Sequence, residues 1–186
     1  PGWLWGLLGL VYLVWLLNLY NFMDGSDGLA GGMGGIGFGA LALLSWEAGA
    51  TDYAVLAALI SASCLGFLFW NWHPARLFLG DVGAVPLGYL LASLALAGPL
   101  PLWVTLLIFS PFVVDATATL LQRLRRGEAI WRPHRQHYYQ RLLQAGLGHR
   151  DTALLAYGLM LLAALSAGLL WVSGQVWLQI LGLAAW

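Results

Sequence analysis

The sequence predicts an all-α membrane protein, a polytopic helix bundle with about seven transmembrane helices in a single domain over residues 1–186. Hydrophobic residues make up 61% of the chain and charged residues only 9%, whereas about a quarter of an ordinary soluble domain is charged. Seven apolar runs are candidates for helices that cross a bilayer, which takes about 20 residues, and the seventh is a shorter run. A soluble fold with so little charge would expose a large apolar surface to water, and this excludes the soluble classes.

Short polar connections separate the apolar runs, which are predicted as helices. The runs cover residues 3–19, 29–45, 53–70, 85–97, 102–121, 153–172 and 176–186. Tryptophans and a tyrosine near the ends of the first run are typical of residues that anchor a helix at the membrane interface. Glycine and proline at residues 98–101, and a serine–glycine pair at residues 173–174, predict turns between runs.

All of the basic charge falls on one face of this predicted bundle. Alternating the runs places connections 18–28, 71–83 and 122–151 on one face, and 47–52, 98–101 and 173–175 on the other. The chain has no lysine, and its eight arginines all lie in the first set of connections. The positive-inside rule therefore predicts that the first face is cytoplasmic.

A first polar cluster follows the first apolar run and consists of Asn18, Asn21, Asp24 and Asp27. Carboxylates at a membrane edge are costly, so they usually pair, bind a cation or line a wet cavity. Glycines within residues 25–35 indicate a broken helix end where backbone can approach a ligand, and their four-residue spacing also favours close helix packing. Carboxylates next to amides suit a hydrated Mg²⁺ ion or the hydroxyls and base edge of a nucleotide. The alternative for Asp27 is a helix N-cap.

A second polar cluster lies in the connection 71–83 and consists of Asn71, His73, Arg76, Phe78 and Asp81. Glycines on both sides of Asp81 predict a tight turn, and a lone acid there is a suitable anchor for a hard cation. The alternative is a structural ion pair between Asp81 and Arg76. His73 is interpreted as structural.

A third cluster is basic and lies in the connection 122–151, where residues 123 and 125–142 carry most of the charge. Pro133 is predicted to open a helix, which would place His134, His137 and Arg141 on one face. Most arginines here fit contact with anionic lipid headgroups, but two histidines and an arginine on one face fit a surface that handles phosphate groups. Asp115, inside the fifth run, is a functional candidate because acids within membrane helices are expensive. Its alternative role is a pair with an arginine of the next turn.

These motifs, in this order, resemble those of one known family. The stretches NLYNFMDGSDGLAGG (18–32), PARLFLGDVGAVPLG (74–88), DATATLLQRLRRGE (115–128) and RPHRQHYYQRL (132–142) are similar to the polyprenyl-phosphate sugar-1-phosphate transferases, glycosyltransferase family 4. This family includes the enzymes that begin O-antigen and teichoic acid synthesis and the muramoyl-pentapeptide transferase. The HRQHYYQRL segment of the fourth stretch looks more like the O-antigen or GlcNAc-1-phosphate branch than like the muramoyl-pentapeptide branch, which is richer in histidine.

The resemblance implies an Mg²⁺-dependent enzyme, with Mn²⁺ as an alternative ion, in the bacterial inner membrane with its site on the cytoplasmic face. UDP-N-acetylhexosamine and undecaprenyl phosphate would react to give a lipid-linked sugar pyrophosphate and UMP, starting O-antigen, lipopolysaccharide or related cell-envelope synthesis. No nucleic acid is expected as a partner. A homodimer is the alternative to a monomer. By motif position, the implied catalytic residues are Asp81 (also the metal ligand), His134, His137, Asp24 and Asp27. The implied substrate-binding residues are Asn18, Asn21, Gly25, Asn71, Phe78 (stacked on uracil) and Arg141.

The family also carries an aspartate-rich motif in an earlier cytoplasmic loop, and the residues before Asn18 are a single apolar segment without it. We therefore expect this sequence to be the C-terminal part of a longer transferase, and no turnover if it is the whole natural product. The alternative is a non-catalytic membrane remnant or subunit that keeps the fold and weak UDP-sugar binding. A transporter ranks last, because only Asp115 lies deep in a predicted span.

Overall fold

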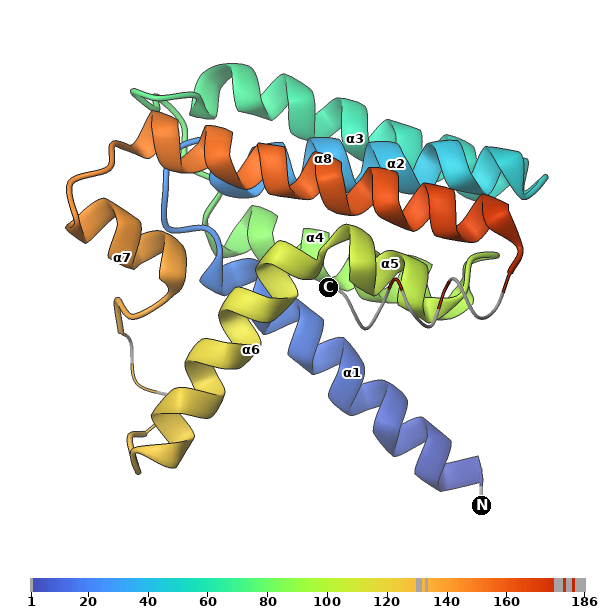
Figure 1. The fold of residues 1–186 in the computed structure, drawn as a ribbon, viewed down its shortest axis with the longest axis horizontal. Helices are drawn as coiled ribbons and strands as arrows, with labels where there is room; N and C mark the ends of the chain where they lie inside the picture. The colour runs from blue at the N-terminus through green and yellow to red at the C-terminus, as the bar shows by residue number, and fades with distance from the viewer. Residues whose placement is uncertain (1, 130–131, 133, 176–178, 180–181, 183–186) are drawn as a thin grey trace.

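Helices form the framework of the protein in the computed structural model, which describes residues 2–129, 132, 134–175, 179 and 182 (Figure 1). Within that part of the chain the helices are α1 (Gly2–Phe22), α2 (Leu29–Glu47), α3 (Thr51–Asn71), α4 (Gly80–Ala97), α5 (Leu102–Ile108), α6 (Ser110–Arg125), α7 (Tyr138–Gln144) and α8 (His149–Ser173).

The predicted class, a polytopic bundle of membrane helices, is confirmed. Among the described residues, α1, α2, α3, α4 and α8 are each long and apolar enough to cross a membrane, and the bent pair α5 and α6 would make a sixth span. About seven spans were predicted from the sequence. Most of the seventh predicted run, residues 176–186, lies outside the described residues.

The fifth predicted run is not one straight helix, because α5 and α6 meet at an angle of 83°. Pro111 lies in the first turn of α6. Proline has no backbone N–H, so it cannot donate the hydrogen bond that would continue α5. Phe109, at the bend, is buried and packs edge-on against Phe38 of α2, with 5.8 Å between ring centroids. A Cβ atom on Gly37 would lie 2.1 Å from the Phe109 ring. A glycine in α2 therefore makes room for the aromatic side chain that holds the bend in the core.

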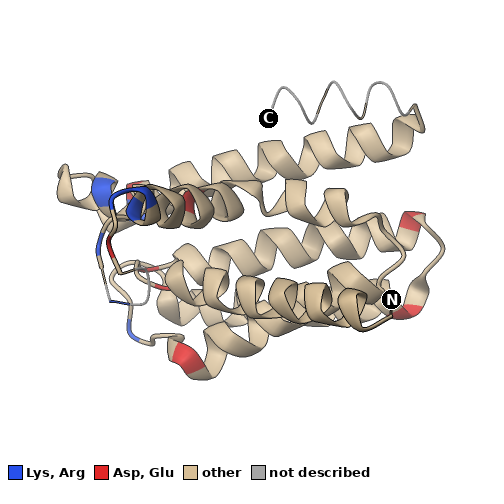
Figure 2. Cartoon of the chain, turned by 90° about the horizontal axis from the view of Figure 1, so that it is seen from below, with Lys and Arg blue, Asp and Glu red and all other residues tan. Residues whose placement is uncertain are grey.

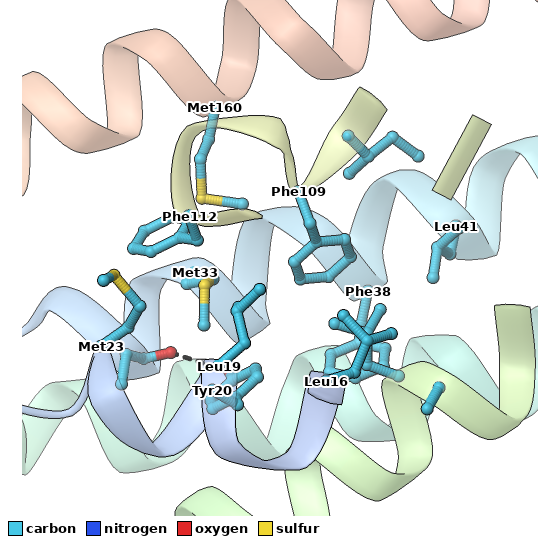
Figure 3. Close-up of a cluster of buried hydrophobic side chains, with 14 of the residues drawn as sticks. Leu16, Leu19, Tyr20, Met23, Met33, Phe38, Leu41, Phe109, Phe112 and Met160 are labelled. Carbon is cyan, nitrogen blue, oxygen red and sulfur yellow. Dashed lines mark hydrogen bonds between the residues drawn. The ribbon is translucent and has the colours of Figure 1, made fainter. Parts of the chain in front are cut away.

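The core lies where α1, α2, the α5–α6 bend and α8 meet (Figure 3). Helix α2 is central, between α3 and α8 (Figure 1). Its glycines allow close packing: a Cβ on Gly35 would lie 2.6 Å from the Leu65 side chain, and the Ser61 hydroxyl donates a 2.7 Å hydrogen bond to the Gly35 carbonyl. The glycine-spaced segment therefore packs closely against α3.

Helices α1 and α6 diverge from the bundle (Figure 1). The C-terminal third of α1 is buried against α4, where a Cβ on Gly88 would lie 2.7 Å from the Leu17 Cα atom. The first half of α1 exposes large apolar side chains, among them Trp3 and Trp5. An apolar surface of this size is suited to contact with lipid.

The charged residues divide between the two ends of the bundle, with the basic ones gathered at a single end (Figure 2). That end carries the connections α1–α2, α3–α4 and α6–α8. The other end carries α2–α3 and α4–α5, and there the Tyr53 hydroxyl donates to the Ala97 carbonyl. The predicted grouping of the connections is therefore present in the fold.

Candidate active site

The α1–α2 connection, residues 23–28, is the centre of the candidate site. Helix α1 ends at Phe22, and Gly28 adopts a left-handed conformation with φ of 75° before α2 begins, which only glycine adopts at little cost. The predicted broken helix end is thus confirmed. Neither the carboxylate of Asp27 nor any other side chain caps α2, so the N-cap alternative for Asp27 is wrong.

Three side chains from distant elements hold this connection in place. The buried Asn71 amide accepts a 2.9 Å hydrogen bond from the Gly28 N–H and donates a 2.8 Å bond to the Leu77 carbonyl. The Tyr157 hydroxyl, from α8, donates to the Gly28 carbonyl, and the Tyr139 hydroxyl, from α7, donates to the Phe22 carbonyl at 3.0 Å. The loop that carries Asp24 and Asp27 is therefore fixed by α3, α7 and α8 together.

Asn18 and Asn21 lie on the last turns of α1, before this loop. The Asn18 amide donates a 2.7 Å hydrogen bond to the Val14 carbonyl of the same helix and is exposed. Gly25 is exposed in the loop, and a Cβ there would lie 2.1 Å from the Tyr139 hydroxyl oxygen. Gly25 thus lets α7 approach the loop backbone.

Asp24 and Asp81 bring two predicted site loops together. The Asp24 carboxylate accepts a 2.9 Å hydrogen bond from the N–H of Gly80, the first residue of α4, and Asp81 is exposed next to it. Burial raises the pKa of Asp24, the Gly80 N–H opposes that change, and repulsion from Asp81 adds to it. A cation between two repelling carboxylates would relieve the repulsion.

Proteins often bind Mg²⁺ through one or two carboxylates, while substrate phosphates and water complete the coordination shell of the ion. The two carboxylates of Asp24 and Asp81 fit this kind of site. Among the described residues, no group of three or more histidines, cysteines or acids is arranged to hold a metal by itself. Within the same residues no hydrogen bond or ion pair joins Asp81 to Arg76. Asp81 is therefore free of the predicted alternative partner, and Asp24 is the second acid near it.

Phe78 presents an aromatic face on this end of the protein, with 73% of its surface exposed. It lies in the α3–α4 connection, three residues before Asp81. An exposed ring beside acidic groups is a suitable platform for stacking a nucleobase.

Asp27 belongs to a polar cluster that the sequence only partly indicated. Its Oδ2 atom lies 2.7 Å from His73 Nδ1 and accepts a 3.2 Å bond from the Ala75 N–H. Burial raises the pKa of Asp27, but the bonds from His73 and Ala75 and the nearby imidazoles outweigh it and lower the pKa overall. The His73 ring stacks on His149, with 5.5 Å between centroids, and His149 Nδ1 lies 2.9 Å from the Ser26 hydroxyl.

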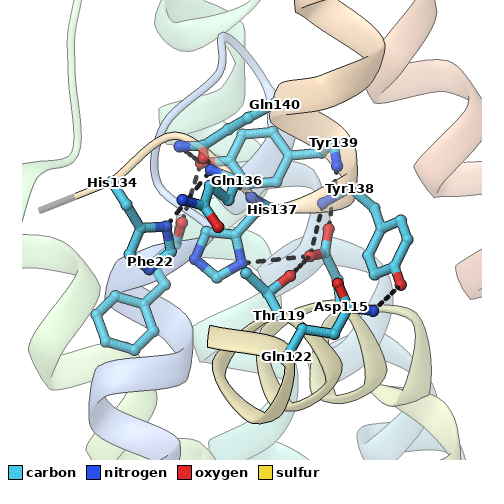
Figure 4. Close-up of polar contacts among 10 residues, drawn as sticks. All are labelled: Phe22, Asp115, Thr119, Gln122, His134, Gln136, His137, Tyr138, Tyr139 and Gln140. Atoms are coloured by element: carbon cyan, nitrogen blue, oxygen red, sulfur yellow. Dashed lines mark hydrogen bonds and ion pairs between the residues drawn. The ribbon is translucent and has the colours of Figure 1, made fainter. Parts of the chain in front are cut away.

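The two histidines of the third cluster lie outside a helix. Helix α7 begins at Tyr138, so the predicted helix that places His134, His137 and Arg141 on one face is wrong; Pro133 lies outside the described residues. The imidazoles of His134 and His137 nevertheless lie 4.9 Å apart between ring centroids (Figure 4). The backbone at His137 is extended. The two rings are therefore neighbours for a different reason from the helical spacing on which the prediction was based.

The surroundings of His134 disfavour the protonated form of its imidazole. Burial lowers its pKa, the charges of Arg123 and His137 lower it further, and Glu128 opposes them. Arg123 is itself buried and pairs with Glu128 at 3.0 Å. The exposed Arg141 places its guanidinium 5.2 Å from the centre of the Tyr138 ring.

Sequence reasoning did not identify Ser26, Tyr139, His149 and Tyr157, which tie the α1–α2 connection and the end of α1 to α7 and α8. The available signal was weak: His149 is a polar residue at the start of an apolar run on the basic face. Tyr139 and Tyr157 resemble ordinary interfacial aromatics. Their contacts are between residues more than 100 positions apart, which local patterns do not reveal.

Comparisons with known proteins agree with this architecture. The model of glycosyl transferase family 4 matches residues 1–99. A probable undecaprenyl-phosphate N-acetylglucosaminyl 1-phosphate transferase of Bacillus subtilis is 34% identical over 153 residues, 77% of this chain and 42% of that protein. A decaprenyl-phosphate N-acetylglucosaminephosphotransferase of Mycobacterium leprae is 34% identical over 122 residues, 56% of this chain and 30% of that protein. A phospho-N-acetylmuramoyl-pentapeptide-transferase of Shouchella clausii is 34% identical over 109 residues, 57% and 33% of the two chains.

The fold and the family match define the class as an integral bacterial membrane protein with a polar site at one end of its bundle. The chain belongs to glycosyl transferase family 4, the family of polyprenyl-phosphate sugar-phosphate transferases. It spans less than half the length of these curated relatives.

Proposed function

We propose that the protein transfers an N-acetylhexosamine 1-phosphate group from a UDP-sugar to undecaprenyl phosphate at the cytoplasmic face of the bacterial inner membrane. An oxygen of the lipid phosphate attacks the sugar-linked phosphorus, the bond from that phosphorus to the UMP oxygen breaks, and UMP leaves. The product would start O-antigen, lipopolysaccharide or a related cell-envelope glycan. The single observation that carries this proposal is that the α1–α2 connection is bonded both by Gly80 next to Asp81, at Asp24, and by Tyr139 of α7, at Phe22.

Each part of the site has a role in this proposal. Phe78 stacks on uracil, while Asn18, Asn21, Gly25, Asp27 and Asn71 form the uridine end. His134, His137 and Arg141 contact the phosphates or the sugar. Asp81, with Asp24, would hold Mg²⁺ or Mn²⁺, and the ion when bound would neutralise charge on the pyrophosphate. Transfer reactions of this kind depend on positioning and charge stabilisation more than on covalent chemistry by the protein.

The test uses membranes that contain the protein at its full natural length. They receive undecaprenyl phosphate, Mg²⁺ and a panel of UDP-sugars labelled in the sugar and the sugar-linked phosphate. We expect one UDP-N-acetylhexosamine to give a labelled lipid and an equal amount of UMP, with none after chelation of the metal. Binding of UDP-sugar without lipid product would contradict the transferase and favour a non-catalytic subunit.

A further inference from the structure

Asp115 is a buried acid of α6, 9% exposed, that the proposed reaction does not yet use. Its Oδ1 atom accepts a 2.9 Å hydrogen bond from the Tyr138 N–H, lies 3.3 Å from His137 Nδ1 and accepts a 3.3 Å bond from the Thr119 hydroxyl. Its Oδ2 atom accepts a 3.1 Å bond from the Tyr139 N–H. One carboxylate therefore has four partners, three of which lie at the start of α7 (Figure 4).

The arginine of the next turn is not the partner of Asp115, so that predicted alternative is wrong. Arg123 pairs with Glu128 and donates a 2.8 Å bond to the Ala129 carbonyl. Gln136 donates to the same Glu128 carboxylate at 3.2 Å. The loop before α7 is thus tied to α6 twice, once through Arg123 and once through Asp115.

His137 is almost completely buried, with 2% of its surface exposed. Its ring stacks between neighbours: 5.8 Å separates its centroid from that of Phe22, and 6.0 Å from that of Tyr139. The His137 N–H of the backbone is bound by the Gln140 side chain at 3.2 Å. Both the backbone and the ring of His137 are therefore fixed, and the remaining freedom is the position of the ring proton.

An ionised carboxylate only accepts hydrogen bonds. The contact between Asp115 Oδ1 and His137 Nδ1 therefore requires the proton on Nδ1, and in the neutral ring this leaves the lone pair on Nε2. In a neutral imidazole, the hydrogen bond made by one ring nitrogen determines which nitrogen carries the proton, and the other nitrogen is then the acceptor. Ring orientation and tautomer are therefore both set by an acid of α6.

We propose that Asp115 is a positioning residue that sets the Nδ1–H tautomer and the orientation of His137, so that Nε2 is free for the phosphate-bearing substrates. This proposal rests on the proposed function for its catalytic consequence. The tautomer itself is a property of the protein alone. In unrelated enzymes an acid-to-amide change beside a catalytic histidine leaves the geometry intact and lowers kcat by supplying the wrong tautomer.

The first experiment measures the tautomer without any substrate. The full-length protein, labelled with ¹⁵N-histidine and placed in lipid nanodiscs, gives ring nitrogen shifts, and His137→Gln identifies the His137 signals. We expect the Nδ1–H pattern in the wild type and its loss in Asp115→Asn. The Nε2–H pattern in the wild type would overturn the proposal, and this holds even where Asp115→Asn does not fold.

The second experiment measures sugar-phosphate transfer. Asp115→Asn should lower kcat by about 100-fold or more with KM for the UDP-sugar changed less than threefold, and Asp115→Glu should recover part of kcat. The matched control is Asp151→Asn, an exposed acid at the same end of the protein, which should keep wild-type kcat. Unchanged kcat in Asp115→Asn would overturn the positioning role. A wild type with no transfer would contradict the proposed function, and the nitrogen shifts would then still decide the tautomer.

Discussion

The backbone N–H of Gly80 donates a 2.9 Å hydrogen bond to the carboxylate of Asp24, across 56 positions of sequence. This bond places the start of α4, and with it Asp81, against the loop that follows α1. The two acids repel one another, which contributes to the raised pKa of Asp24. Two loops that are separate in the sequence thereby form one acidic site.

Asp81→Asn should lower the rate of Mg²⁺-dependent transfer by about 100-fold or more, because a bound metal contributes several kcal/mol of charge stabilisation. Insertion of the protein into the membrane should be unchanged. Removal of the Asp81 charge should also lower the pKa of Asp24. The measurement is transfer as a function of Mg²⁺ concentration, with Asp52→Asn at the opposite end of the bundle as the control. Wild-type activity in Asp81→Asn would refute the metal assignment.

The histidines should differ in importance. His137→Ala should lower transfer more than His73→Ala, because His137 is buried against Asp115 whereas His73 is partly exposed and pairs with Asp27. We expect about 100-fold loss for His137→Ala and less than about tenfold for His73→Ala, since exposed ion pairs contribute little. Initial rates with saturating lipid acceptor measure this. The reverse order would overturn the ranking.

The lowered pKa of His134 predicts a pH dependence of stability. Between that lowered pKa and the ordinary value of 6.5, the unfolded chain binds more protons at this site than the folded chain. The contribution of His134 to the free energy of unfolding is therefore complete above pH 6.5 and is lost as pH falls through the folded-state pKa. In detergent, the thermal midpoint of His134→Gln should change less between pH 5 and 7 than the midpoint of the wild type. An equal pH slope in the two proteins would contradict the prediction.

Gly32→Ala should destabilise the protein by about 1–3 kcal/mol through overpacking. A Cβ at Gly32 would lie 2.1 Å from atoms of the Tyr157 ring, which reaches from α8 to the Gly28 carbonyl. Gly66→Ala in α3 is the matched control, because nothing lies within 4 Å of its Cβ position. Thermal midpoints of the three proteins provide the comparison, and equal values for Gly32→Ala and wild type would show that α8 packs differently.

Asn71→Leu should weaken both folding and UDP-sugar binding. The buried Gly28 N–H would lose its partner, at about 1–3 kcal/mol, and the bond from Asn71 to the carbonyl of the exposed Leu77 would also be lost. Calorimetric titration with UDP-sugar and thermal unfolding measure the two effects. Gln175→Leu, an exposed amide at the other end of the bundle, should alter neither. Unchanged affinity in Asn71→Leu would mean that the loop keeps its shape without this bridge.

The spans and the grouping of connections followed from the sequence, because hydropathy and charge act residue by residue along the chain. Two predictions that were wrong, a straight fifth span and a helix that carries His134 and His137, failed for physical reasons. The 83° bend of α5 and α6 depends on Pro111 together with the burial of Phe109 against Gly37, and the second condition is a tertiary contact. The start of α7 depends on Asp115, which binds the N–H groups of Tyr138 and Tyr139 from another helix.

By itself, the sequence determined that this protein is a polytopic membrane bundle with its arginines at one end and with three polar loops there. Those properties depend on the cost of placing charge and unpaired backbone in hydrocarbon, which each segment meets alone. Only the tertiary structure decided which polar groups meet: Asp24 with Gly80, Asp27 with His73, and Asp115 with His137. Hydrogen bonds are short and directional, so such pairings depend on how the helices pack and not on the spacing of residues along any one of them.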